Sequence, residues 1–449
     1  MRTQFSDAYD QENPVMRMGF WPGGDRDGNP FVTSDITLKV ADALRGSIIK
    51  CYYLDVRKLR RRLTFEGVEG KLQELEKKLY NNIFIPGYTA DLKKAEVLDT
   101  LYEIRELIVF NHNGLFLNLV DGLINRVHLF GLHFATLDIR QDSSVHSLVI
   151  TEICALSGKE DYSAMDDAQK IEWLSSLSTA VILDESVTAI TKDTIDSVKA
   201  VKHIQEQNGK PGSDRYIISQ CNSAVDMLEV FALFVLGGWK RDAISVDIIP
   251  LFETIGDLKN AADVMQLLYT FPQYRDHLKR RGNKQTVMLG FSDGTKDGGY
   301  LMANFSIFKA KQALSAISAK FGIDVVFFDG RGGPPARGGG KTHKFYASMG
   351  SDISNKEIEL TVQGQTVSSN FGTIDAAQFN IEQLLHAGIG NALFSNGAST
   401  FSQNEMLLIE QLAEESFQSY TALKNHPFFL DYLSHASPLR FYAETNIGS

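Results

Sequence analysis

The feature that most constrains the fold is a recurring alternation of short apolar runs with helical patterns. The short runs are rich in β-branched or aromatic residues and end in polar or glycine-rich turns, which predicts strands. Helical periodicity follows, for example where Ala303, Ile307 and Leu314 share one face. Such alternation predicts βα crossovers and a parallel sheet. The expected strands are residues 18–21, 135–139, 216–219, 245–250, 286–289 and 325–328.

Candidate functional residues follow directly after these runs, where parallel sheets and barrels carry their active sites. Six strands do not close an eight-stranded barrel, so we expect an α/β fold: an incomplete TIM-like barrel with large, mostly helical insertions. We expect residues 1–345 to form this partial barrel, with a helical insertion at about 34–128. Residues 346–449 are expected to hold a β-hairpin at 357–367 and then a helical segment.

Composition excludes several classes of protein. The net charge of -10 disfavours a general nucleic-acid surface, which needs a basic field. The basic run at 58–63 is better explained as a solvated helix face. Three widely spaced cysteines fit no disulfide framework, and neither an apolar signal region nor a membrane-span run occurs. We therefore expect a cytoplasmic protein with no membrane or nucleic-acid partner.

Two arginines stand in candidate anion-binding segments. Arg26 lies within the sequence GGDRDGNP at 23–30, where glycines allow backbone amides to approach an anion. Arg140 emerges where a strand gives way to a loop, which suits bidentate binding of phosphate or carboxylate. The alternatives are structural: a tight Asp/Gly turn with an internal salt bridge, and pairing of Arg140 with Asp138 or Asp142.

Two carboxylates follow neighbouring strands. Glu253 comes directly after one, and Asp293 follows the next. Carboxylates without a histidine or cysteine cluster favour a hard cation, Mg²⁺ or Mn²⁺, and two protein ligands leave positions for substrate oxygens. The alternative is a pair of loop caps. Lys296 either balances Asp293 or touches substrate.

A glycine-rich segment at 329–343 contains Arg331 and Arg337. Arginines among glycines describe a mobile cationic loop able to close over an anion, and a flexible surface turn is the alternative. The Gly-Lys-Thr within it is not a P-loop, because Pro335 stands where the first glycine would be needed.

Together these segments resemble the phosphoenolpyruvate carboxylase family over essentially the whole chain. The motifs occur in the family order: GGDRDGNP, LDIRQ, PLFET, SDGTKDGGY, and GRGG followed by RGGG. The resemblance implies an eight-stranded α/β barrel embedded in helices. It also implies a lyase of anaplerotic carbon dioxide fixation, which carboxylates phosphoenolpyruvate with bicarbonate to give oxaloacetate and phosphate.

The resemblance also implies a role for each matching residue. Glu253 and Asp293 would be ligands of Mg²⁺ or Mn²⁺. The substrate phosphate would be held by Arg140 and Arg331, with Lys296 close by. Arg337 would act in catalysis and bind an allosteric carboxylate inhibitor such as aspartate or malate. The remaining expected substrate-binding residues are Arg26, Gly332 and Gly333, and the family is usually a homotetramer.

Some features depart from the family pattern. No segment like the family's TAHPTE, which carries a catalytic histidine, precedes Gly19, and the family's C-terminal part is absent. Asp329 stands where a histidine is common, and it would repel phosphate unless paired with Arg331 or Lys341. We therefore expect a truncated fragment with little turnover. The alternatives are another phosphoenolpyruvate-handling barrel enzyme and a non-catalytic binding or assembly module.

Overall fold

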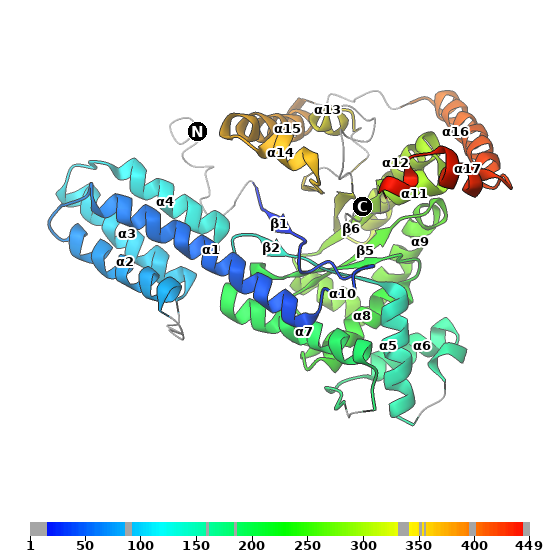
Figure 1. Ribbon diagram of the computed structural model, residues 1–449, viewed down its shortest axis with the longest axis horizontal. Helices are drawn as coiled ribbons and strands as arrows, with labels where there is room; N and C mark the ends of the chain where they lie inside the picture. Colours follow the sequence, from blue (N-terminus) through cyan, green and yellow to red (C-terminus); the bar gives the residue numbers. More distant parts are fainter. Residues whose placement is uncertain are drawn as a thin grey trace. The chain divides into compact units, whose positions relative to one another are not determined.

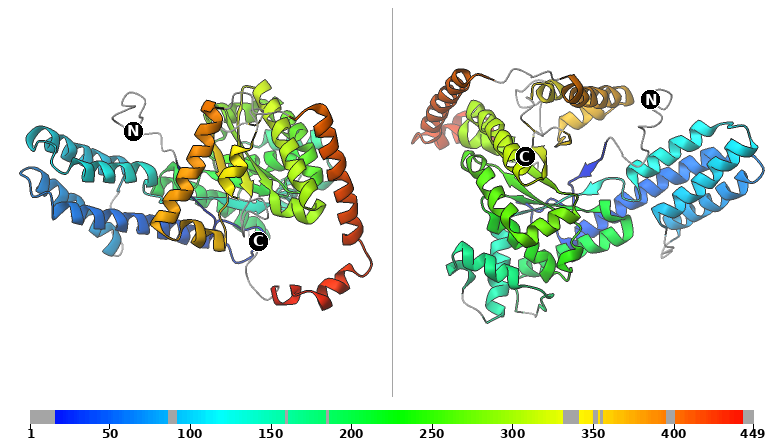
Figure 2. Two further views of the ribbon diagram at one scale, coloured as in Figure 1. Left: turned by 90° about the horizontal axis from the view of Figure 1, so that it is seen from above. Right: turned by 180° about the vertical axis from the view of Figure 1, so that it is seen from behind.

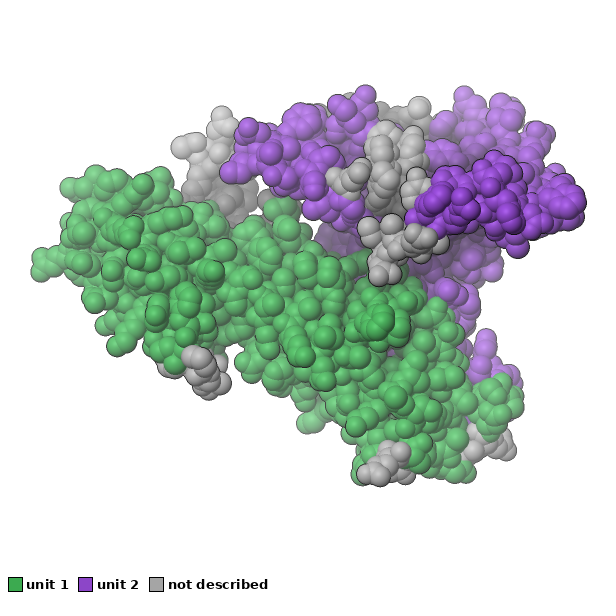
Figure 3. Space-filling view, in the orientation of Figure 1, with its two compact units in different colours: residues 1–164, 177–216, 232–246 green, residues 165–176, 217–231, 247–449 purple. Residues whose placement is uncertain are grey.

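The computed structural model describes residues 16–85, 92–158, 161–183, 186–330, 341–349, 353, 356–394 and 401–442. It confirms an α/β fold with a parallel sheet and many helices. The chain forms two compact units, coloured separately in Figure 3. Unit 1 comprises residues 1–164, 177–216 and 232–246, and unit 2 comprises residues 165–176, 217–231 and 247–449.

A helical insertion makes up much of unit 1 (Figure 1). Its apolar residues recur every three or four positions, so each helix buries one face against the others. The resulting core belongs to the insertion itself and includes Tyr52, Leu72 and Ile104. The four helices are α1 (Ser34–Arg60), α2 (Val68–Phe84), α3 (Lys94–Asn111) and α4 (Leu117–Phe130).

Short strands flank this insertion in unit 1. β1 (Gly19–Phe20) and β2 (Thr136–Leu137) pair in parallel, with Gly19 opposite Thr136. β3 (Ile139–Asp142) follows at once, and the Asp142 side chain caps the next helix by accepting from the Ser144 amide at 2.8 Å. The remaining helices are α5 (Ser143–Leu156), α7 (Ala189–Asn208) and the 3₁₀ turns Tyr162–Ala164, Lys210–Gly212 and Arg241–Ala243.

The main sheet has six strands in the order β3-β4-β5-β6-β7-β8, and unit 2 holds the strands from β4 onward. β6 and β7 pair in parallel over seven residues, from Lys284 opposite Asp324 to Gly290 opposite Gly330. Nearly every residue of these strands is buried, as expected for a sheet covered on both faces. The strands are β4 (Arg215–Ser219, which begins in unit 1), β5 (Asp247–Phe252), β6 (Lys284–Gly290), β7 (Asp324–Gly330) and β8 (Ile358–Leu360).

Helices connect these strands. The helix expected from the periodicity of Ala303, Ile307 and Leu314 is confirmed as α12 (Tyr300–Lys320), and α8 (Ala224–Leu236) follows β4. α9 packs against α12, and this pair covers part of the sheet (Figure 2). The other connecting helices are α6 (Asp167–Ser176), α9 (Ile255–Thr270), α10 (Pro272–Arg280) and α11 (Phe291–Gly298).

The β-hairpin expected at 357–367 was wrong. A single strand, β8, pairs in parallel with β7 at the open edge of the sheet, with Phe327 opposite Ile358. Gly364, at φ 55°, then starts a helix where a hairpin would turn back. The remaining helices are α13 (Thr342–Ala347), α14 (Gln365–Phe371), α15 (Ile374–Phe394), α16 (Gln403–Lys424), α17 (Phe429–Ala436) and α18 (Leu439–Tyr442). Of the helices described, none has the length and apolarity required to cross a membrane.

Candidate metal and phosphate site

Glu253 and the first turn of α11 lie against each other at the end of two neighbouring strands. The register of β5 and β6, with Phe252 opposite Leu289, sets Glu253 beside Gly290. A Cβ on Gly290 would lie 3.1 Å from Glu253 Cγ, and one on Gly294 would lie 3.3 Å from the Glu253 carbonyl oxygen. Glycine at both positions therefore allows the segment that carries Asp293 to approach Glu253 closely.

The Glu253 carboxylate is oriented from a third strand. Its Oε2 accepts a hydrogen bond from the Gln220 backbone N–H at 2.8 Å, directly after β4. Gln220 has a φ of 50°, a left-handed conformation that non-glycine residues adopt at a cost and that is concentrated at functional sites. On the other side, Thr254 and Asp257 form a capping box that starts α9. Glu253 is thus held between a fixed turn and a fixed helix start.

Asp293 lies in the first turn of α11, where a negative charge is favourable for the helix. Lys296 contacts it one turn later, with Nζ 3.0 Å from Oδ1. Both side chains are exposed, to 43% for Asp293 and 61% for Lys296. Lys296 therefore balances Asp293 in this structure, and the exposure of the pair leaves both groups accessible to a ligand.

The donor set fits a hard cation. Glu253 and Asp293 provide only oxygen donors, and the described residues contain no group of three or more His, Cys, Asp or Glu side chains suited to a metal. Two hydroxyls in neighbouring sequence positions, those of Ser219 before Gln220 and Ser292 before Asp293, are buried and have no hydrogen-bond partner in the described structure. Unpaired buried hydroxyls are costly unless a ligand or water satisfies them.

Asp329 at the end of β7 is fully buried and paired, but with neither partner considered from the sequence. Lys311 of α12 approaches it, with Nζ 2.7 Å from Oδ1, and the Tyr346 hydroxyl donates to Oδ2 at 2.8 Å. The Lys311 ammonium also lies 5.2 Å from the centre of the Phe327 ring. The carboxylate charge is thus compensated inside unit 2. Repulsion of a phosphate by an unpaired Asp329 is not expected.

In unit 1, Arg140 is held by carboxylates 115 and 113 positions away in sequence. Its Nε donates to Asp25 Oδ1 at 2.7 Å, and an Nη lies 3.0 Å from Asp27 Oδ2. A parallel bridge between Asp25 and Arg140 brings these segments together. Burial raises the pKa of Asp25, and the neighbouring Arg140 guanidinium opposes that shift.

The other side chains of this cluster are also paired. Arg26 is buried against Asp193 of α7, so the flanking acids do not hold it. Asp138 accepts from Arg215 at 2.8 Å and from the Trp21 indole at 2.9 Å. His146 is buried and its Nε2 lies 2.9 Å from the Tyr216 hydroxyl oxygen.

The predicted residues therefore fall into two described groups and one undescribed one. Arg26 and Arg140 lie together in unit 1. In unit 2, Glu253 packs against the segment that carries the Asp293–Lys296 pair. The predicted residues that lie outside the described part of the chain are Arg331, Gly332, Gly333 and Arg337. Sequence reasoning missed Gln220 and Lys311, which no local pattern marks because each acts through a partner on another element.

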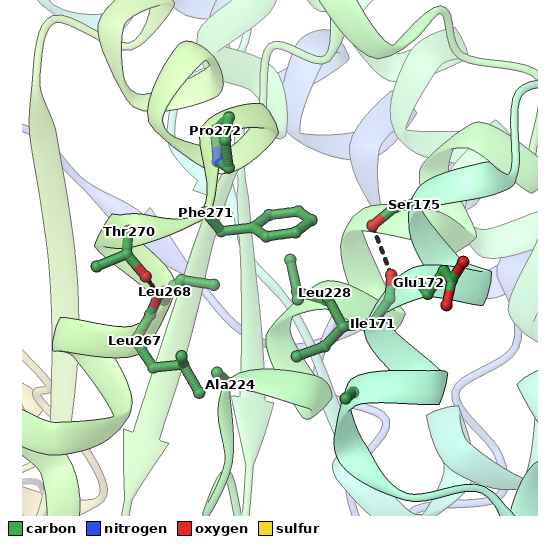
Figure 4. A pocket seen from close by; sticks show the side chains of 11 residues that line it. Ile171, Glu172, Ser175, Ala224, Leu228, Leu267, Leu268, Thr270, Phe271 and Pro272 are labelled. Atoms are coloured by element: carbon green, nitrogen blue, oxygen red, sulfur yellow. Dashed lines mark hydrogen bonds between the residues drawn. The ribbon is translucent and has the colours of Figure 1, made fainter.

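A cavity of about 390 Å³ lies elsewhere in unit 2 (Figure 4). Its walls are mostly apolar and come from α6, α8 and the segment joining α9 to α10, with Ile171, Leu228 and Phe271 facing it. Its part of α9, around Leu268, is thirteen residues from Ile255, or about 20 Å along the helix at 1.5 Å per residue. The cavity is therefore separate from the carboxylates at the strand ends.

The chain has an α/β fold with carboxylates and arginines at the ends of parallel strands, which is where proteins of this fold class carry their active sites. The family model of phosphoenolpyruvate carboxylase matches residues 1–84 and 86–449. The chain belongs to the phosphoenolpyruvate carboxylase family. It is 28% identical, over its full length, to phosphoenolpyruvate carboxylase of Mycobacterium leprae and 30% identical, over 97%, to that of Nitrosomonas eutropha. It spans about half of each relative, 53% and 52%.

Proposed function

We propose that this chain contributes to the family reaction, the carboxylation of phosphoenolpyruvate by bicarbonate to give oxaloacetate and phosphate. The observation that carries the proposal is the contact of Glu253 with the α11 turn that presents Asp293, in a chain matched by the family model almost throughout. On this basis the sheet is part of an eight-stranded barrel, and the protein acts in the cytoplasm.

Glu253 and Asp293 would hold Mg²⁺ or Mn²⁺. The bound ion would neutralise charge on substrate oxygens and stabilise the enolate oxygen as it develops. The chain's own residues orient the two carboxylates: the Gln220 amide fixes one face of Glu253, and the helix start of α11 supports the charge of Asp293. Lys296 exchanges its contact with Asp293 for one with substrate.

The arginines would bind and orient the phosphoryl group. A bicarbonate oxygen attacks phosphorus, the bond from phosphorus to the enol oxygen breaks, and carboxyphosphate and the enolate of pyruvate result. The enolate carbon then bonds to the carboxyl carbon, and phosphate leaves. Arg140 and Arg331 supply the positive charge that the equatorial oxygens need, and Asp25 and Asp27 hold Arg140 in one orientation. Arg337 also recognises a carboxylate effector, aspartate or malate.

Alternative chemistry suggested by Asp329 gains no support from the structure. Its charge is compensated by Lys311 and its carboxylate is inaccessible, so it does not confront the substrate directly.

The decisive test is Mn²⁺ binding to the full chain, followed by Mn²⁺-dependent binding of phosphoenolpyruvate, both measured by calorimetry. We expect Asp293→Asn to weaken Mn²⁺ binding by at least about tenfold, because it removes a charged ligand. Asp276→Asn is the matched control, since Asp276 also forms an exposed pair with a lysine three residues later, at 2.9 Å. Equal affinities for the two variants would refute the metal site. Oxaloacetate formation, coupled to NADH oxidation by malate dehydrogenase, then reports the reaction itself.

A further inference from the structure

Asp297 connects the two segments that carry Glu253 and Asp293. It lies in the last turn of α11, four residues after Asp293. Its Oδ2 accepts a hydrogen bond at 3.0 Å from the backbone N–H of Ile255, the first residue of α9 and the second after Glu253. One carboxylate therefore ties the end of α11 to the start of α9.

The end of α11 is held in turn by α16, more than a hundred residues further along the chain. The last carbonyl groups of a helix have no partner within it. Here the Tyr420 hydroxyl donates to the Lys296 carbonyl at 2.9 Å, and Lys424 Nζ donates to the Asp297 carbonyl at 2.8 Å. The Lys424 ammonium also lies 3.6 Å from Asp297 Oδ1 and near the negative end of the α11 dipole. α16 thus caps α11 from outside.

Packing leaves little freedom at this junction. A Cβ on Gly298 would lie 2.5 Å from Ile255 Cγ1, and one on Gly299 would lie 3.1 Å from the Tyr420 ring. Gly299 also has a φ of 79°, which favours glycine. The three segments are therefore in direct contact, and a change in one is transmitted to the others.

We propose that Asp297 is a positioning residue for the metal site, and that Tyr420 and Lys424 of α16 hold it in place. The inference rests on the proposed metal role of Glu253 and Asp293. Asp297 itself is not assigned as a ligand, since one oxygen faces the Ile255 amide and the other faces Lys424. Residues that orient metal ligands typically change metal affinity 10- to 100-fold when they are replaced.

The first measurement is Mn²⁺ affinity of the full chain by calorimetry. Asp297→Ala removes the acceptor for the Ile255 amide, and we expect it to weaken binding by about 10- to 100-fold. Asp297→Asn keeps an acceptor oxygen and loses only the charge, so it should recover most of the affinity. Tyr420→Phe should produce a smaller loss in the same direction. Lys279→Met, which removes an exposed lysine from a pair on α10, is the control and should leave the affinity unchanged.

A second measurement does not depend on metal. In hydrogen exchange followed by mass spectrometry, Asp297→Ala and Lys424→Met should both increase deuterium uptake in peptides covering 253–260 and 291–299. Uptake that rises only in 291–299 would show that Asp297 does not couple the two segments and would overturn the inference.

The outcomes separate this inference from the proposed function. If Asp293→Asn weakens Mn²⁺ binding and Asp297→Ala does not, the metal site stands and the positioning role is refuted. If Asp293→Asn has no effect, the metal site itself is refuted, and the inference with it. If Asp297→Asn loses as much affinity as Asp297→Ala, the hydrogen bond to Ile255 is not the contact that matters, and the inference fails.

Discussion

Two lysine–aspartate pairs lie near the ends of neighbouring strands in unit 2, and they differ in burial. Lys296 and Asp293, after β6, are 61% and 43% exposed and lie 3.0 Å apart. Lys311 and Asp329, at β7, are 2% and 0% exposed and lie 2.7 Å apart. The chemistry of the two pairs is the same. The exposed charges remain available to a ligand, whereas the buried ones are committed to each other.

The exposure of a charged pair therefore distinguishes a ligand-binding role from a structural one better than the types of its residues do. An exposed pair contributes little to stability, because water already solvates both groups. A buried pair need not stabilise the fold either, but loss of one member leaves the other as an uncompensated charge in the protein interior. The two pairs should therefore respond in opposite ways to the same type of substitution.

The largest effect is expected at the buried pair. Lys311→Met leaves Asp329 without its counter-charge and should lower the free energy of unfolding by about 3–5 kcal/mol, measured by urea denaturation. The double variant Lys311→Met/Asp329→Asn removes both charges and should recover much of that loss. A decrease below about 1 kcal/mol for the single variant would contradict the distinction.

His146 is a buried titratable group without an ionic partner, and it allows the effect of burial to be tested by changing the pH. Burial, reinforced by the charge of Arg26, lowers the pKa of His146 from 6.5 to about 3. Between these values the unfolded chain binds a proton that the folded chain does not. The free energy of unfolding should therefore fall as the pH drops below about 6.5, by up to about 1.4 kcal/mol per pH unit from this group.

Urea denaturation of the wild type and His146→Gln between pH 7 and pH 5 isolates this contribution, because other groups titrate in both proteins. The wild type should lose more stability than the variant over this range. Parallel curves would show that His146 does not differ in proton affinity between the folded and unfolded states.

The smallest effect is expected at the exposed pair. Lys296→Met should change the free energy of unfolding by less than about 1 kcal/mol, because both side chains are solvated. The measurement is again urea denaturation, with Lys279→Met on α10 as the matched exposed pair. A loss comparable to that of Lys311→Met would mean that exposure does not distinguish the two pairs.

Much of the α/β framework could be predicted from the sequence because it depends on local patterns. The β-branched runs gave all six expected strands, and the amphipathic periodicity of α12 marked that helix. Carboxylates at strand ends were recognisable because parallel strands present their ends at the same edge of a sheet. The failures concern partners distant in sequence. The structural alternative for Arg140 paired it with Asp138 or Asp142, but the Asp25 bridge brings carboxylate partners from the other side of the helical insertion.

The same reason explains what no pattern could reveal near the candidate metal site. Tyr420 and Lys424 are 124 and 127 residues from the carbonyl groups they cap. In the sequence, Lys311 has no feature that distinguishes it from other helix lysines. Only the packing of α12 on the sheet places it beside Asp329. The prediction of a hairpin at 357–367 was wrong because an available sheet edge, and not the local sequence, determined the pairing of β8.

The glycines at 290, 294 and 298 have a consequence for how this segment tolerates change. They recur every four residues, and a Cβ on each would meet the segment 253–255 at 2.5–3.3 Å. Replacing a glycine within a helix by alanine normally stabilises it by about 0.5–1 kcal/mol. Here the usual preference is reversed by contact. In a library that varies every position from 290 to 298, these three positions should tolerate the fewest substitutions, although a glycine carries no functional group.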